Sequence, residues 1–71
     1  MDEWILVQFP ESRTVLVDDT PTGVTNKAIL VQRGTHVVAL GGDQNYSPPS
    51  ITRQVVNTTK ANPMLFVFTK L

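Results

Sequence analysis

The one histidine of this chain, His36, is the residue best suited to acid–base chemistry. A catalytic histidine needs an orienting carboxylate and a nucleophile or substrate proton within reach. The chain has no cysteine to act as that nucleophile, and no Gly-x-Ser-x-Gly sequence frames a serine. We therefore expect His36 to be a half-buried strand histidine bonded to a turn, and not a catalyst or a metal ligand.

A group of oxygen-bearing side chains follows a short apolar run. Two adjacent acids, Asp18 and Asp19, have Thr20, Thr22 and Asn26 close by. Calcium takes six to eight oxygen ligands and commonly uses several spaced carboxylates, and a third acid is missing here. Asp also bonds its own backbone in turns, so we expect a hydrogen-bonded turn. The sequence predicts no metal and no other cofactor.

Tyr46 lies beside Pro48 and Pro49 and is the one loop aromatic. Such a residue serves as a platform for a sugar or a proline-rich peptide when its ring is exposed. The simpler expectation is a corner residue whose ring packs on the core while its hydroxyl bonds a loop. We favour the corner, and a small carbohydrate-binding module that uses Tyr46 is the alternative function.

These residues lie among short apolar runs rich in Val, Ile and Leu, which are typical of strands. A long polar turn is expected at 18–23 and a hairpin at Arg33–Gly34, with positive φ at Gly34. Near-regular spacing indicates a small antiparallel β-sandwich of six or seven strands. Six strands are predicted, at residues 4–9, 14–17, 27–32, 35–40, 51–56 and 64–69.

A series of motifs in this order resembles the PEGA domain family. It consists of Pro10, Val15-Leu16-Val17-Asp18, Gly23-Val24-Thr25, Ile29-Leu30-Val31, the run from Arg33 to Leu40, and Asn45-Tyr46. The sequence departs from the family pattern at Ser12-Arg13, Asp18-Asp19, Thr25-Asn26 and Asn45-Tyr46. The chain is identified as a divergent member on the order and spacing of these motifs.

The resemblance implies a prealbumin-like Greek-key sandwich that forms one domain over residues 1–71. It also implies a non-enzymatic structural or protein-interaction module of the kind appended to envelope and cell-surface proteins. The compartment would then be extracytoplasmic, although no signal peptide is visible in the sequence.

The composition and motifs of the chain argue against nucleic-acid binding, membrane insertion and enzymatic activity. The chain has 71 residues, with six basic and six acidic side chains, and the basic ones are scattered. Nucleic-acid binding favours a clustered basic surface, so no nucleic-acid partner is expected. The longest apolar run, residues 64–68, is far too short to insert across a membrane. The chain also lacks a base–nucleophile pair, metal-ligand spacing and a phosphate-binding loop, so no enzyme is expected.

The first and last predicted strands are apolar on both faces, whereas a strand with one solvent-facing side should alternate apolar and polar. The interior of one small sandwich can cover only one face of each of these two strands. We expect Ile5, Val7, Phe9, Met64, Phe66 and Phe68 to face the core. We expect a homodimer or docking surface formed by Trp4, Leu6, Leu65 and Val67. In the alternative, the N-terminal segment folds over a sheet edge and no partner is needed.

Overall fold

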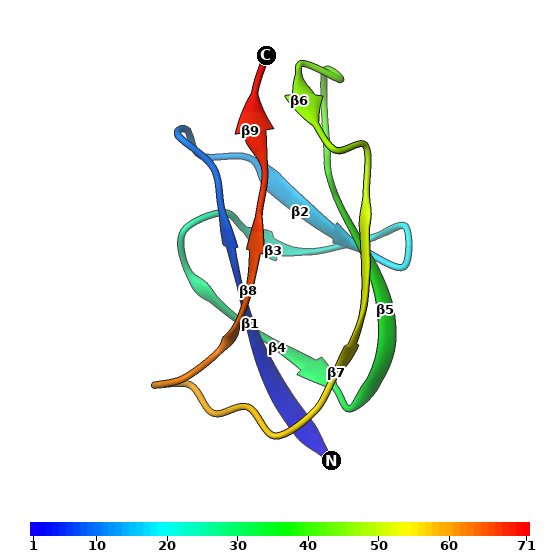
Figure 1. Cartoon of the computed structure of the whole chain (residues 1–71), viewed down its shortest axis with the longest axis vertical. Helices are drawn as coiled ribbons and strands as arrows, with labels where there is room; N and C mark the ends of the chain where they lie inside the picture. Colours follow the sequence, from blue (N-terminus) through cyan, green and yellow to red (C-terminus); the bar gives the residue numbers. More distant parts are fainter.

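Two β-sheets pack against each other (Figure 1). A cluster of apolar side chains lies between them. The computed structural model describes all 71 residues and contains nine strands. It has no helix that is long and apolar enough to cross a membrane. The strands are β1 (Asp2–Gln8), β2 (Thr14–Val17), β3 (Thr20–Val24), β4 (Ala28–Gln32), β5 (Gly34–Leu40), β6 (Tyr46–Ser47), β7 (Ile51–Val55), β8 (Met64–Val67) and β9 (Thr69–Lys70).

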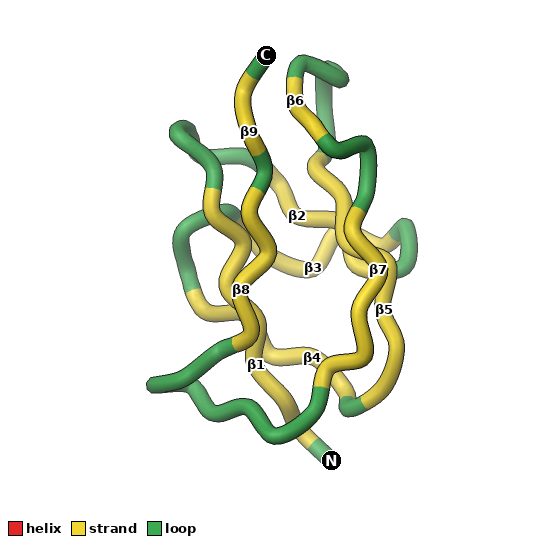
Figure 2. Tube along the Cα trace, viewed as in Figure 1, coloured by secondary structure: helices red, strands yellow, loops and turns green.

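The first sheet has the order β4-β1-β8 and the second has the order β3-β2-β5-β7. The short strands β6 and β9 form a third pair near the C-terminal end (Figure 2). All paired strands are antiparallel except β1 and β8, which run parallel. The predicted all-β sandwich is therefore confirmed, with the parallel β1–β8 pair as a departure from a purely antiparallel arrangement.

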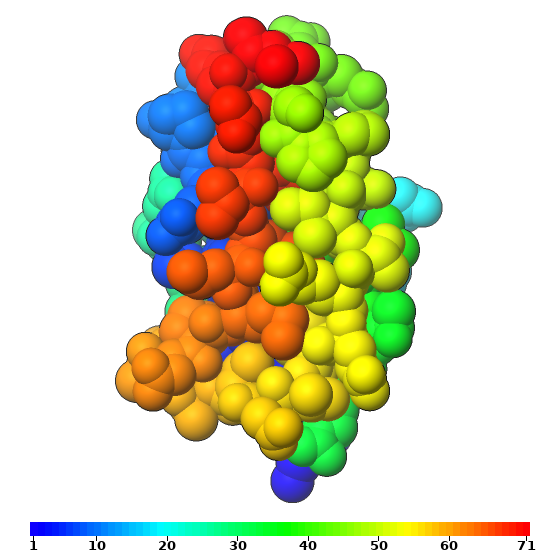
Figure 3. Space-filling model, in the orientation of Figure 1, coloured from blue at the N-terminus to red at the C-terminus, as the bar shows by residue number.

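Alternation along the strands builds the core. Every second residue of β1 is buried, and the same pattern appears in β2 and β4. Side chains fill the space between the ribbons (Figure 3). The buried apolar cluster contains Ile5, Val7, Phe9, Val15, Val17, Ile29, Val31, Val38, Leu40, Tyr46, Val55, Phe66 and Phe68, with Met64 and Ile51 packed against it. The predicted core faces of the first and last strands are confirmed.

The long polar turn predicted at 18–23 is wrong, because most of it is the strand β3. The chain reverses at Asp18 and Asp19 alone, with φ of 52° and 66°, the positive values of a two-residue hairpin turn. Pro21 and Gly23 disfavour a strand, but β3 lies at a sheet edge, where a missing donor is tolerated. Gly23 is also needed for packing, since an added Cβ would lie 2.8 Å from Ile29 Cγ1.

The last predicted strand changes partner partway along its length. Residues 64–67 form β8 and pair with β1, whereas Thr69–Lys70 form β9 and pair with β6. Phe68 lies between them, and its N–H donates to the carbonyl of Gln8 at 3.0 Å. The strands β3, β6 and β9 account for the difference between the six or seven strands expected and the nine found.

The positive φ predicted at Gly34 is confirmed at 137°, but the predicted hairpin is wrong. β4 pairs with β1, and β5 pairs with β2 and β7, so Arg33–Gly34 carries the chain from one sheet to the other. An added Cβ at Gly34 would meet no atom within 4 Å. The glycine is therefore needed for its backbone conformation and not for space.

We expect Gly34→Val to destabilise the fold by about 1–3 kcal/mol, because a β-branched residue is strained at this φ. Thermal unfolding measures the loss. Gly41→Ala is the matched control, since Gly41 has no positive φ and its added Cβ would lie 3.4 Å from Thr14 Cβ, at ordinary contact distance. An unchanged midpoint for Gly34→Val would show that the corner has a different backbone conformation.

Candidate protein-interaction surface

The structure brings the four residues of the predicted interface together on the solvent side of the sheet β4-β1-β8. Trp4 and Leu6 are half-buried in β1, while Leu65 is 47% and Val67 54% exposed in β8. All four side chains point away from the core because they alternate with the buried residues of the same strands.

The strand register makes this surface continuous. Leu6 lies opposite Leu65 on one side and Ala28 on the other, and Trp4 lies opposite Leu30. Leu30 is 47% exposed and belongs to the same surface. It was not predicted there, because residues 28–31 are apolar on both faces and the sequence does not show which face is buried. We call Trp4, Leu6, Leu30, Leu65 and Val67 the outer apolar face.

Polar residues border the outer apolar face. At the start of β1, Asp2 lies opposite Gln32, and at its end Gln8 lies opposite Val67. Lys60, in the connection between β7 and β8, places its Nζ 5.5 Å from the centre of the Trp4 ring. This distance allows a cation–π attraction between Lys60 and Trp4. The apolar centre and polar border match the composition of protein interfaces.

A buried carboxylate positions the connection that carries Lys60. Glu3 is 2% exposed on the inner side of β1. Its Oε1 accepts hydrogen bonds from the Thr58 hydroxyl at 2.6 Å and the Thr58 N–H at 2.8 Å. The same hydroxyl oxygen accepts from the Trp4 N–H at 2.7 Å. Thr58 therefore links the connection between β7 and β8 to β1 at Trp4, the first residue of the outer apolar face.

The hydrogen bonds from Thr58 hold the pKa of the Glu3 carboxyl below its usual value, first through the hydroxyl and then through the N–H. Burial of Glu3 opposes this shift, and the charge of Arg33, whose Nε lies 3.3 Å from Oε2, adds to it. Glu3 and Thr58 are 55 residues apart in the chain, so no local pattern in the sequence could reveal their contact.

β1 is the central strand of its sheet, between β4 and β8, so the N-terminal segment does not fold over a sheet edge. Ahead of it, the carbonyl of Met1 accepts a hydrogen bond from the Arg33 N–H at 2.8 Å. The alternative that needed no partner therefore fails on the placement of β1. Lys60 lies over the Trp4 ring, while Leu30, Leu65 and Val67 stay about half exposed.

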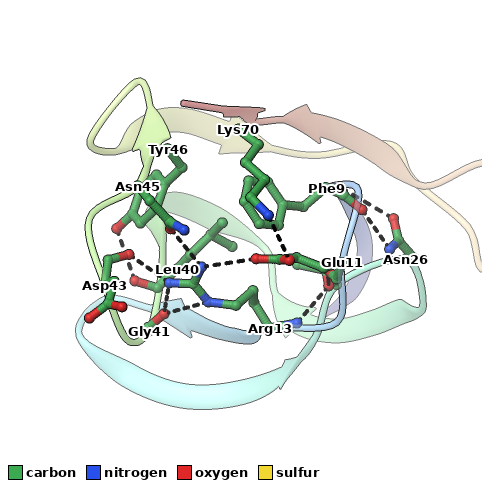
Figure 4. Close-up of polar contacts among 11 residues, drawn as sticks. Phe9, Glu11, Arg13, Asn26, Leu40, Gly41, Asp43, Asn45, Tyr46 and Lys70 are labelled. Atoms are coloured by element: carbon green, nitrogen blue, oxygen red, sulfur yellow. Dashed lines mark hydrogen bonds and ion pairs between the residues drawn. The ribbon is translucent and has the colours of Figure 1, made fainter.

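At the opposite end of the molecule, Arg13 holds the loop after β5 (Figure 4). Its Nε donates to the carbonyl of Gly41 at 3.0 Å, and its Nη2 donates to the carbonyls of Gly41 and Asp43. Its Nη1 donates to Asn45 Oδ1 at 2.8 Å. The guanidinium is thus bonded within its own chain, which identifies Arg13 as a structural cation.

Tyr46 lies at this same end, in the corner that the sequence predicted. The ring is 5% exposed and meets Phe68 edge-on at a centroid distance of 5.5 Å. Its hydroxyl donates to the carbonyl of Leu40 at 2.9 Å. The alternative role as a ligand contact is wrong for Tyr46, because a sugar platform requires an exposed ring face.

His36 shares a strand face with Val38 and Leu40 and is bonded to a turn, as predicted. Its Nδ1 lies 2.6 Å from Asp18 Oδ2, in the turn between β2 and β3. Asp18 is therefore used by the protein itself, and nowhere do three or more His, Cys, Asp or Glu side chains gather in a group that could hold a metal. The surface also carries no pocket.

No family model, no curated protein and no solved structure matches the chain. The resemblance to the PEGA domain family therefore stays a prediction from the sequence.

We expect Thr58→Val to lower the thermal midpoint, and to lower it more at neutral pH than at acid pH. The carboxylate of Glu3 stabilises the fold above its ordinary pKa and loses that effect as the pH falls through its lowered folded pKa. Loss of the hydroxyl raises the folded pKa toward its ordinary value, so Glu3 contributes less stability at neutral pH and the deficit of the variant shrinks as the pH falls. Thermal melts between pH 7 and pH 3 measure both effects.

Thr59→Val is the matched control, because Thr59 is exposed and its hydroxyl only accepts from the Asn62 N–H nearby. If the thermal midpoints of Thr58→Val and Thr59→Val depended on pH in the same way between pH 7 and pH 3, the role assigned to Thr58 would be contradicted.

Proposed function

We propose that this chain is a non-enzymatic structural or protein-interaction module that presents the outer apolar face to another protein surface. The observation that carries the proposal is the pattern of β1, which is apolar on both sides although the core covers only one. A solvated strand face normally carries polar residues, and an exposed apolar patch on a small domain commonly marks an interface.

The chemistry of the polar residues supports a non-enzymatic role. The side chains most often used in catalysis and anion binding are engaged within the chain: His36 by Asp18 and the Gln32 carbonyl, and Arg13 by the loop at Gly41. The sequence resemblance to PEGA domains, which are appended to envelope and cell-surface proteins, points to the same class of function.

The partner that fits the outer apolar face best is another flat sheet, and a second copy of the chain is the first partner to test. Three strands about 4.8 Å apart make a face only about 10 Å wide between its outermost strands. Two such faces bury less than the ~1,200 Å² of a stable standard-size interface. Self-association should therefore be weak, with a dissociation constant above about 10 μM.

We expect sedimentation equilibrium of the wild-type chain, from micromolar to millimolar concentration, to show a reversible monomer–dimer equilibrium. Leu65→Asp should remove the dimer, because it places a charge within the outer apolar face, directly opposite Leu6. A wild-type chain that stays monomeric at millimolar concentration would contradict self-association through this face.

Val37→Asp is the matched control for this experiment. Val37 is 41% exposed, close to the 47% of Leu65, but it lies on β5 in the other sheet. It should leave the dimer intact, and a dimer lost equally in both variants would show that added charge alone, and not the outer apolar face, controls association.

A further inference from the structure

The His36 ring lies between two hydrogen-bond acceptors. Nδ1 is 2.6 Å from the carboxylate oxygen Oδ2 of Asp18, and Nε2 is 2.6 Å from the backbone carbonyl oxygen of Gln32. An ionised carboxylate and a carbonyl accept hydrogen bonds and donate none. A neutral imidazole has a single N–H, so it satisfies only one of the two contacts. The imidazolium, with two N–H groups, satisfies both.

The contact to Gln32 crosses between the sheets, whereas the contact to Asp18 stays within one sheet. Asp18 begins the turn between β2 and β3, Gln32 ends β4, and His36 itself belongs to β5. The strands β2, β3 and β5 belong to one sheet, and β4 belongs to the other. The ring is also largely covered, with 14% of its side-chain surface exposed, so water replaces a lost contact only if the chain moves.

We propose that His36 is a proton-dependent latch that fastens the end of β4 to the second sheet when its ring is charged and releases it when the ring loses a proton. The released contact is the one to Gln32. On deprotonation the remaining proton stays on Nδ1, because the bond to an anionic carboxylate is stronger than the bond to a neutral carbonyl. The lone pair of Nε2 then faces the carbonyl oxygen and repels it.

The turn keeps its place in either state. Asp18 Oδ1 accepts from the Val37 N–H at 3.0 Å, and the Asp18 N–H donates to the Val37 carbonyl at 2.8 Å. Neither bond depends on His36. Opening therefore affects the end of β4 and the Arg33–Gly34 corner that follows it.

The charged groups around the ring define the pH window. Asp18 and Asp19 are the anions of the adjoining turn, Arg53 lies opposite His36 on β7, and Arg33 belongs to the corner and pairs with Glu3. The bond to Asp18, followed by the bond to the Gln32 carbonyl, raises the pKa of His36, while burial opposes the shift and the attraction of Asp18 adds to it.

The sign of the effect follows from linkage. Because the folded pKa of His36 is raised, the stabilisation is fully present below the unfolded value of about 6.5 and is lost as the pH rises through the folded pKa. The pKa of Asp18 is lowered, first by the Val37 N–H and then by His36. Its contribution is present above the ordinary carboxyl pKa and disappears as the pH falls through the lowered one. The latch is therefore closed between the lowered pKa of Asp18 and the raised pKa of His36.

An NMR titration of the single histidine tests this directly. We expect a His36 pKa above 6.5, with the charged ring protonated on both nitrogens and the neutral ring keeping the proton on Nδ1. Amide exchange at Arg33, whose N–H bonds the Met1 carbonyl beside the latch, should accelerate through the same titration by more than the tenfold per pH unit of base catalysis. A pKa at or below 6.5, or a neutral ring protonated on Nε2, would overturn the latch.

Two variants separate the latch from a general effect of pH. As the pH rises through the His36 pKa, the thermal midpoint of the wild type should fall. The thermal midpoint of His36→Gln should stay constant over the same pH interval. Asp18→Asn keeps a carbonyl oxygen for the Val37 N–H but removes the charge, so the His36 pKa should fall toward its ordinary value. Equal pH dependence in His36→Gln and the wild type would contradict the proposal.

Discussion

The structure depends on one constraint: β1 is apolar on both faces, and the domain has a single interior. β1 is the central strand of its sheet, so Ile5 and Val7 reach the middle of the core. The same strand carries Trp4 and Leu6 on its other side, together with Leu30 and Leu65 from its neighbours. Burial of apolar surface is the main stabilising term for a domain of this size, and here part of that surface is left to water.

The chain has no cysteine, and long-range polar contacts connect its loops at both ends. Near the N-terminus, the buried carboxylate of Glu3 holds Thr58 and with it the connection between β7 and β8. Near the C-terminus, the guanidinium of Arg13 holds the loop at Gly41 and lies 5.8 Å from the centre of the Tyr46 ring (Figure 4). A buried ion bonded on several sides keeps its partners in one arrangement, because separation would leave a charge without partners.

The predictable part of this fold came from local alternation. The period of two identified the buried faces of the first and last strands, and the residues left over from that count supply four of the five members of the outer apolar face. The pairing of the strands could not be predicted from the sequence. The positive φ of Gly34 was predicted correctly, but nothing in the sequence indicates that β4 and β5 belong to different sheets. β3 was hidden because Pro21 and Gly23 read as turn residues, although an edge strand accepts both. The contacts of Glu3 and Arg13 join residues distant in the chain and leave no periodic signal.

The central claim is that two copies of the chain associate through the outer apolar face. The most direct test is an NMR dilution series of the unmodified chain, in which amide and methyl shifts are followed residue by residue from millimolar to micromolar concentration. The account predicts concentration-dependent shifts confined to Trp4, Leu6, Leu30, Leu65, Val67 and their immediate neighbours. Shifts on the exposed side of β3-β2-β5-β7, or none at any concentration, would contradict it.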